Sequence, residues 1–261
     1  MQHQAKKRFG QNFLIDGNII QRIVESINPQ TDDTIIEIGP GLGAITRPLL
    51  KHSETLHVIE LDRDVIPKLL FNCRNEGKPI IHEMDVLKFN FSEFRKNTAS
   101  QKKLRVVGNL PYNISTPVLF LLLNSRDDIQ DMHFMLQKEV IERIAAQPGN
   151  RIYGRLSVMI QTYFKVTPLF LVPPIAFEPP PKVDSAILRL IPDDSFSSRV
   201  KDHKAYEDMI RQSFSQRRKT LKNNLKNLCD VNKIIAADID PTRRAEELSV
   251  DDFLKLHNHI S

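Results

Sequence analysis

Short apolar runs rich in β-branched residues alternate with amphipathic stretches from Thr34 to about Ile191, and this alternation most constrains the fold. It is typical of a parallel sheet flanked by helices, because parallel strands need long crossover connections. Two later runs, 164–171 and 185–190, fit an antiparallel hairpin that closes one edge of such a sheet. The strands predicted for the parallel part are 34–38, 56–61, 79–84, 105–108 and 132–137.

The pattern changes after Ile191, where residues 192–198 (PDDSFSS) resemble a linker. The chain beyond them has helical periodicity and almost no strand signal. We therefore predict an α/β domain over residues 1–191 and a small helical domain over residues 192–261.

Composition limits where the protein can be located and what it can bind. The net charge of +5 favours a polyanionic partner only mildly. The two cysteines, Cys73 and Cys229, have no cysteine or histidine near them at metal-ligand spacing, so we expect reduced thiols and no metal. No secretory signal or membrane-spanning run is apparent, and we expect a cytoplasmic protein without membrane contact.

A glycine-rich loop follows the first predicted strand, in the segment 37–43 (EIGPGLG). Glycines between a strand and a helix allow a tight turn and a close approach to a ligand. Gly39, Gly41 and Ala44 also fit the loose pattern of a dinucleotide site, and an ordinary strand-to-helix turn is the simplest alternative. The loop alone leaves the ligand open.

Two acidic residues narrow the choice of ligand. Glu60 ends the second strand, where a carboxylate can accept hydrogen bonds from both hydroxyls of a ribose, and this suits NAD and S-adenosylmethionine equally. Asp85 ends the third strand and could accept from the exocyclic amine of an adenine. Acids at consecutive strand ends favour a cofactor that carries adenosine, although each taken alone could be a helix cap.

The segment Asn109-Leu110-Pro111-Tyr112 follows the fourth strand. The lone pair of an adenine amine is delocalised into the ring, so its alkylation needs acceptors that hold the N–H groups. The side chain of Asn109 and the carbonyl of Leu110 could be those acceptors. Pro111 would fix the turn and Tyr112 would offer a face for stacking, whereas the simplest alternative is a turn that only shapes the backbone.

With these motifs the chain resembles the small-subunit ribosomal RNA adenine N6,N6-dimethyltransferases, the kasugamycin-sensitivity family. The resemblance runs nearly end to end, without departures at the motif positions. The segments that carry it are 7–14 (KRFGQNFL), the 39–43 loop, Glu60, Asp85, 109–112, 177–185 (FEPPPKVDS) and 214–221 (FSQRRKTL).

The resemblance implies a Rossmann-like class I S-adenosylmethionine-dependent methyltransferase domain followed by a helical domain. It implies dimethylation of two adjacent adenosines in the 3′-terminal hairpin loop of 16S rRNA, with the small subunit or its assembly precursor as partner. We expect the protein to act as a monomer. The positions implied to contact or border the cofactor are Asn12, Leu14, Gly39, Glu60, Asp85 and Asn109.

The resemblance also places Phe177 beside the target adenine, together with the 109–112 turn. Phe177 precedes three consecutive prolines, and such a stiff segment loses little entropy on ordering. Its ring could therefore face Tyr112 across the base. The alternative is that Phe177 anchors the loop in the core.

Basic residues cluster in two places that we predict to contact rRNA backbone. One cluster is near the N-terminus: Lys6, Lys7 and Arg8. The other is Arg217, Arg218, Lys219, Lys222 and Lys226. On one continuous helix, these last three lysines would share a face, with Phe214, Leu221, Leu225 and Leu228 on another.

Three other functions compete with this interpretation. The chain could be a non-catalytic assembly factor or a transcription factor on the same fold, but the intact 109–112 motif disfavours pure binding. It could be a large-subunit rRNA or DNA adenine methyltransferase, but the 9–14 and 214–221 segments favour the small-subunit group. A dehydrogenase is disfavoured, because no positioned His or Lys for hydride chemistry accompanies the glycine loop.

Overall fold

The computed structural model describes residues 11–53, 55–98 and 100–260. The chain forms two compact units, Met1–Lys138 with Thr167–Ile191, and Glu139–Val166 with Pro192–Ser261. The chain thus enters the second unit twice. The chain enters the second unit for the second time after Ile191, the residue at which the sequence predicts a domain boundary.

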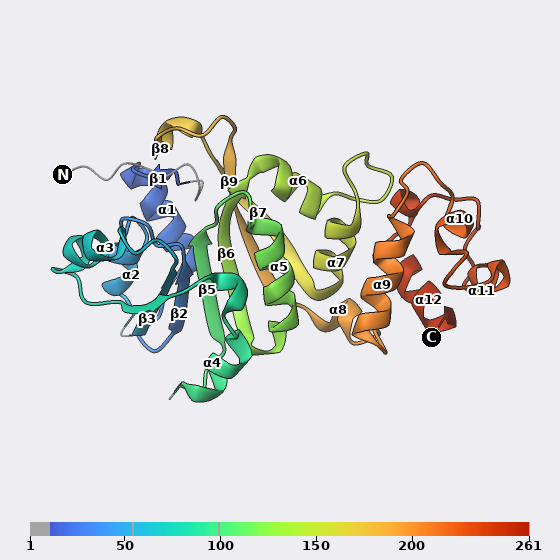
Figure 1. Ribbon diagram of the computed structural model, residues 1–261, viewed down its shortest axis with the longest axis horizontal. Helices are drawn as coiled ribbons and strands as arrows, with labels where there is room; N and C mark the ends of the chain where they lie inside the picture. Colours follow the sequence, from blue (N-terminus) through green and yellow to red (C-terminus); the bar gives the residue numbers. More distant parts are fainter. Residues whose placement is uncertain (1–10, 54, 99, 261) are drawn as a thin grey trace. The chain divides into compact units, whose positions relative to one another are not determined.

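A seven-stranded sheet forms the centre of the first unit, with β2, β5 and β6 side by side in its middle (Figure 1). The strand order is β4-β3-β2-β5-β6-β9-β7. The five strands from β4 to β6 pair in parallel, and β9 is antiparallel to β6. The predicted Rossmann-like α/β fold is confirmed. The strands are β2 (Thr34–Ile38), β3 (Thr55–Glu60), β4 (Ile80–Glu83), β5 (Leu104–Asn109), β6 (Ile129–Gln137), β7 (Phe164–Val172) and β9 (Ser185–Pro192).

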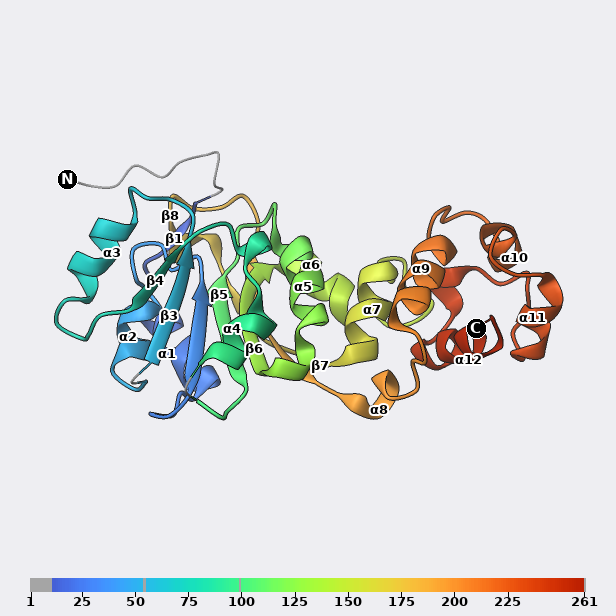
Figure 2. The ribbon, with the colours of Figure 1, turned by 60° about the horizontal axis from the view of Figure 1, so that its bottom comes forward.

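The central strands are buried along almost their whole length, as expected where helices cover both faces of a parallel sheet. Every residue of β2 is buried, and so are the first five of β5. Figure 2 shows β2 and β3 with helices α1 and α2 beside them. The helices of this unit are α1 (Gly17–Ile27), α2 (Thr46–Leu50), α3 (Ile66–Cys73), α4 (Phe91–Asn97) and α5 (Ser115–Asn124), with short 3₁₀ turns at Val86–Lys88, Arg126–Asp128 and Pro174–Ala176.

A buried ion network joins β5 and β6 to the end of α1. The guanidinium of Arg105 donates two hydrogen bonds of 2.8 Å to the carboxylate of Asp131 and one of 2.7 Å to Asp33. It also donates to the carbonyls of Ile27 and Asn28. All five guanidinium N–H groups therefore have an acceptor, which buried charges require.

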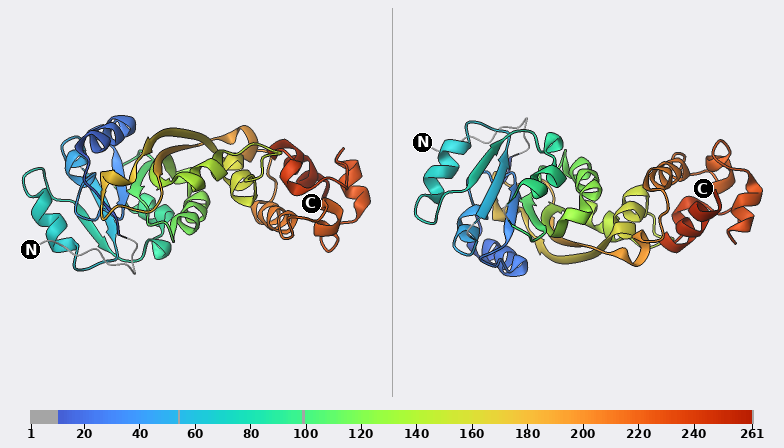
Figure 3. Two further views of the ribbon diagram at one scale, coloured as in Figure 1. Left: turned by 90° about the horizontal axis from the view of Figure 1, so that it is seen from above. Right: turned by 90° about the horizontal axis from the view of Figure 1, so that it is seen from below.

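Helices dominate the second unit (Figure 3). Its core contains large aromatic side chains, among them Tyr153, Tyr206 and Phe253. In the described part of the chain, no helix is both long and apolar enough to cross a membrane. The helices are α6 (Lys138–Ala145), which begins at the last residue of the first unit, α7 (Arg155–Tyr163), α8 (Asp194–Ser197), α9 (His203–Ser213), α10 (Leu221–Leu225), α11 (Val231–Ala236) and α12 (Val250–Ile260), with a 3₁₀ turn at Ala245–Glu247.

The prediction of one continuous helix through residues 214–228 is wrong. Helix α9 ends at Ser213, and α10 begins only after Thr220, whose backbone is extended. The amide of Asn224 donates to the carbonyls of Ser213 and Gln216 at 2.6 and 3.1 Å, so side-chain bonds replace those of a continuing helix. The predicted apolar face is broken too, because Leu228 is exposed.

Candidate active site

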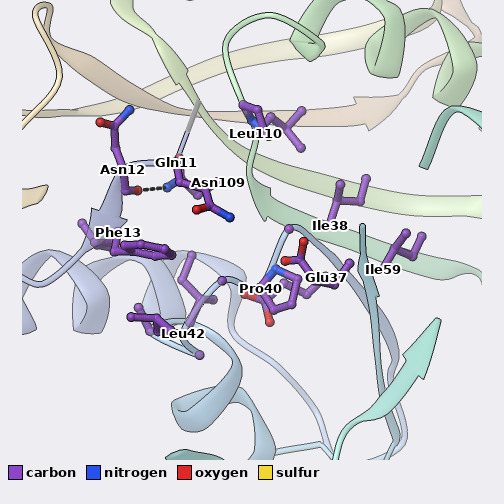
Figure 4. Close-up of a pocket in the computed structure, with 18 of the residues that line it drawn as sticks. Gln11, Asn12, Phe13, Glu37, Ile38, Pro40, Leu42, Ile59, Asn109 and Leu110 are labelled. Atoms are coloured by element: carbon purple, nitrogen blue, oxygen red, sulfur yellow. Dashed lines mark hydrogen bonds between the residues drawn. The ribbon is translucent and has the colours of Figure 1, made fainter. Parts of the chain in front are cut away.

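A cavity of about 730 Å³ opens at the carboxyl ends of the parallel strands (Figure 4). Open α/β sheets bind their ligands at this edge, and the volume suits a cofactor-sized molecule. The cavity draws together segments that are far apart in the sequence. They are residues 11–15, 37–45, 59–61, 84–87 and 109–114, with further residues from α1, from α2 and its C-terminal cap, and from the turn after α3.

The glycine loop forms one wall of the cavity. Gly39 has a φ of +66°, a conformation that favours glycine, and its N–H donates to the carbonyl of Ile59 at 2.9 Å. On the neighbouring strand, a Cβ on Gly108 would lie only 2.5 Å from the carbonyl oxygen of Ile38. Glycine at position 108 therefore lets β5 approach the end of β2 closely, which brings Asn109 beside the loop.

Glu60 and Asp85 both line the cavity, as the sequence predicts for strand ends. Glu60 is buried, and this burial raises the pKa of its carboxyl group. One of its oxygens accepts from the backbone N–H of Asp62 at 2.8 Å. Asp85 accepts from the N–H of Leu87 at 3.0 Å, so it is also a helix cap. Leu61 and Leu87 line the cavity with exposed apolar surface, which suits a planar ring.

Glu37 is a cavity residue that the sequence reasoning missed. Its side chain is only 1% exposed and accepts a 2.6 Å hydrogen bond from the hydroxyl of Thr46. Burial raises its pKa to about 7, with a further contribution from the nearby charge of Glu60. The available signal was an acidic residue within a strand that is otherwise apolar.

Asn109 is the last residue of β5, and its amide points toward the N-terminal segment. The Asn109 Nδ2 donates to the carbonyl of Asn12 at 3.2 Å, the dashed line in Figure 4. This bond fixes which end of the amide is the donor. The Oδ1 of Asn109 is then presented as an acceptor at the cavity wall.

The turn that follows Asn109 is held at several points. The N–H of Leu110 donates to the carbonyl of Met135 at 3.2 Å, and the carbonyl of Pro111 accepts from Ile114 at 3.1 Å. The Tyr112 hydroxyl lies 2.7 Å from that of Ser185. Partial burial raises the pKa of Tyr112, so the phenol stays neutral. Leu110, Pro111 and Tyr112 all line the cavity.

Asn12 and Leu14 also line the cavity, and Leu14 belongs to the short strand β1 (Phe13–Leu14). This strand pairs with β8 (Phe177–Glu178), which sets Leu14 opposite Phe177. The ring of Phe177 is buried in the hydrophobic core and is not part of the cavity lining in the described structure. The arrangement agrees with a core anchor, and the stacking role of Phe177 stays a prediction.

Comparison with known proteins identifies the family. The sequence profile of the ribosomal RNA adenine dimethylases matches residues 2–261. The chain belongs to the ribosomal RNA adenine dimethylase family. Proteins named ribosomal RNA small subunit methyltransferase A are similar to it: the one from Chromohalobacter salexigens is 53% identical, covering 99% of this chain and 92% of the relative. The one from Pseudomonas aeruginosa is 51% identical, covering 100% and 96%.

Solved structures agree with this membership. A dimethyladenosine transferase from Plasmodium falciparum superposes on this dimethylase with a TM-score of 0.78 and 29% identity, covering 94% of this chain and 95% of the other. The 23S rRNA methyltransferase ErmE has a TM-score of 0.73 at 23% identity, with coverage of 95% and 99%, and shares the fold.

Membership in this family implies S-adenosylmethionine as the methyl donor. The cavity fits a cationic ligand that carries adenosine, because Glu37, Glu60 and Asp85 supply carboxylates while Leu61 and Leu87 supply apolar surface. This sulfonium compound provides a strongly electrophilic methyl group. The dimethylase therefore needs no strong general base to activate the amine that attacks it.

The basic residues of the C-terminal region lie in the second unit of the dimethylase. Arg218, Lys219, Lys222 and Lys226 are exposed. Arg217 is exposed as well, but its guanidinium pairs with Glu246 at 2.8 Å and donates to a backbone carbonyl, that of residue 151. The other predicted cluster, Lys6, Lys7 and Arg8, lies outside the described residues.

Proposed function

We propose that this chain dimethylates N6 of two adjacent adenosines in the 3′-terminal hairpin loop of 16S rRNA, with S-adenosylmethionine as donor. The observation that carries the proposal is the amide of Asn109. Its Nδ2 is committed to the carbonyl of Asn12, so its Oδ1 is available at the wall of the cavity. The small-subunit methyltransferases that match this chain over nearly its full length supply the identity of the RNA.

Asn109 and Leu110 would hold the target amine. The Asn109 Oδ1 and the Leu110 carbonyl can each accept one N–H of the adenine N6, which favours a more tetrahedral nitrogen with an available lone pair. Tyr112 can stack on the base. A base in a hairpin loop costs less to extract than one in a duplex, which agrees with a loop substrate.

Gly39, Glu60 and Asp85 would hold the cofactor, since the loop allows close approach and the carboxylates accept from hydroxyl and amine groups. Asn12 and Leu14 would border it from the N-terminal segment. We propose that the enzyme acts as a cytoplasmic monomer on the 30S subunit or its assembly precursor. Sedimentation of the protein alone and with subunits would test the monomer and the partner.

The exposed basic residues of the second unit would contact rRNA phosphates, as would Lys6, Lys7 and Arg8. Replacing Lys219, Lys222 and Lys226 together with alanine should weaken binding and reduce the salt dependence of the affinity by about two counterions or more. A matched control replaces three other exposed lysines of this unit, Lys201, Lys204 and Lys255. An equal salt slope in both triple variants would contradict this surface.

The decisive experiment incubates the protein with radiolabelled S-adenosylmethionine and, in separate reactions, with unmethylated small subunits and with large subunits. Mass spectrometry of the rRNA should find dimethyladenosine at two adjacent positions of the 3′-terminal hairpin. Asn109→Ala should lower the rate by about 100-fold or more, because it removes a preorganised acceptor. Binding without any methylation would favour a pure assembly factor, and modification only of the large subunit would point to the antibiotic-resistance class.

A further inference from the structure

We propose that the Ser185 hydroxyl positions the ring of Tyr112 as the platform for the target base, which makes Ser185 a positioning residue for methylation. The inference rests on the proposed function. Nothing in the 109–112 motif predicts it, because Ser185 is 73 positions away along the chain.

Ser185 is a rigid anchor. It is the first residue of β9, lies opposite Gln137 on β6, and is fully buried. The residue before it is fixed as well, since the carbonyl of Asp184 accepts from the N–H of Lys138 at 3.0 Å. The hydroxyl of Ser185 is therefore held by the antiparallel pairing of the sheet.

Tyr112, in contrast, sits on a turn. Its carbonyl accepts from the hydroxyl of Ser115 at 3.1 Å, which fixes the backbone but not the ring. The ring can still turn about two side-chain torsions. The 2.7 Å contact between the Tyr112 and Ser185 hydroxyls restrains the first of these torsions, and with it the place of the ring, by tying the far end of the ring to β9.

The position of this ring matters for the chemistry. A stacked base can present its amine to Asn109 and Leu110 only if the platform stands at the right place beside them. Small misplacements of a reacting group can cost as much as about 100-fold in rate. The Ser185 hydroxyl, at the end of the proline-rich segment, thus helps to set where the base lies relative to Asn109 and Leu110.

The test compares Ser185→Ala, Ser185→Thr, Tyr112→Phe and the double variant Ser185→Ala with Tyr112→Phe. Losing the hydrogen bond should lower kcat by about tenfold, while the dissociation constant for S-adenosylmethionine changes less than twofold. The double variant should be no slower than Tyr112→Phe alone, because both changes remove the same contact. Ser185→Thr keeps the hydroxyl and should retain most of the wild-type rate.

A second measurement follows stacking directly. A hairpin that carries 2-aminopurine at the target adenosine should be quenched by wild-type protein and less quenched by Ser185→Ala and by Tyr112→Phe. The control is Ser53→Ala, which removes another buried hydroxyl from the same unit, one bonded to the carbonyl of Asp33. It should leave kcat and quenching at wild-type values.

The outcomes separate the two proposals. A wild-type protein that does not methylate unmethylated small subunits refutes the proposed function, and the role of Ser185 in it falls too. An active wild type with unchanged kcat in Ser185→Ala, or additive losses in the double variant, overturns the positioning role alone. If Ser185→Ala does not fold, Tyr112→Phe must still lower both kcat and quenching.

Discussion

Glu37 gives the sharpest quantitative prediction, because the fold buries a carboxyl group beside a ligand cavity. Its pKa is about 7 in the folded protein, against an ordinary value of 4.5, and burial is the main cause. A raised pKa means that the folded state binds the proton more tightly than the unfolded state. The resulting stabilisation is complete below pH 4.5 and is lost as the pH rises through 7.

The magnitude follows from the difference between the two pKa values. At about 1.4 kcal/mol for each pH unit, ionising Glu37 in the folded protein costs about 3 kcal/mol. Glu37→Gln removes this cost, and the glutamine can still accept from the hydroxyl of Thr46. The variant should therefore be more stable than the wild type by about 3 kcal/mol at pH 8 and similar to it at pH 4.5.

Urea unfolding followed by circular dichroism between pH 4.5 and 8 measures this difference. The control is Glu25→Gln, which removes an exposed carboxylate from α1 and should run parallel to the wild type. If the free energies of unfolding of Glu37→Gln and wild type keep the same difference across this range, the carboxyl group ionises at its ordinary pH and the reasoning is wrong.

Glu37→Gln also tests whether the carboxylate of Glu37, which destabilises the fold when it is ionised, contributes to cofactor binding. An ionised Glu37 attracts the cationic donor, so the affinity of the wild type for S-adenosylmethionine should rise between pH 6 and 8 more steeply than that of Glu37→Gln. Calorimetry at several pH values measures both. Equal slopes would show that Glu37 does not sense the charge of the ligand.

The remaining predictions concern stability. Arg105→Met should lower the free energy of unfolding by about 3–5 kcal/mol, because the buried carboxylates of Asp33 and Asp131 lose the guanidinium that pairs with both. Lys102→Ala, at the exposed pair with Asp32, should cost less than about 1 kcal/mol. Gly108→Ala should cost about 1–3 kcal/mol in urea unfolding, because its Cβ would collide with the carbonyl of Ile38, and unchanged stability would contradict the close approach. Burial lowers the pKa of His133 to about 4, so stability should fall between pH 6.5 and 4 as the unfolded chain takes up the proton, and His133→Met should flatten that part of the pH profile.

The sheet was predictable because its signal is local. Every residue of β2 is buried, and a short run rich in β-branched residues that is followed by a glycine loop is typical of a central strand. The glycine loop and the acids at the strand ends were predictable for the same reason, since topology brings the carboxyl ends of parallel strands to one edge. The identities of the cofactor and of the RNA substrate came from the family resemblance, because a pattern of strands does not specify a ligand.

Helical periodicity predicted the wrong structure after Ser213, because the side chain of Asn224 makes hydrogen bonds there that the backbone of a continuing helix would make. Residues 214–220 have helix-compatible spacing, but the buried amide of Asn224 donates to the carbonyl of Ser213 at the end of α9 and to that of Gln216 in the segment after it. Such a hydrogen bond depends on the tertiary packing of Asn224, which the local sequence pattern does not reveal. The lysines after the break are exposed, so their predicted contact with RNA depends on their position on separate elements and not on a shared helix face.

The active site divides in the same way between residues that carry chemistry and residues that orient them. Asn109 is recognisable from its motif, yet the direction of its amide depends on the carbonyl of Asn12, 97 positions away. Tyr112 is recognisable too, yet its ring depends on Ser185. The carbonyl of Asn12 would be the same with any side chain at that position, so the sequence does not reveal its role. Ser185 ends the family segment 177–185, but the sequence does not show that its hydroxyl meets Tyr112. Variants of the motif residues would therefore establish the reaction, whereas variants of the partners are needed to establish the geometry that makes it efficient.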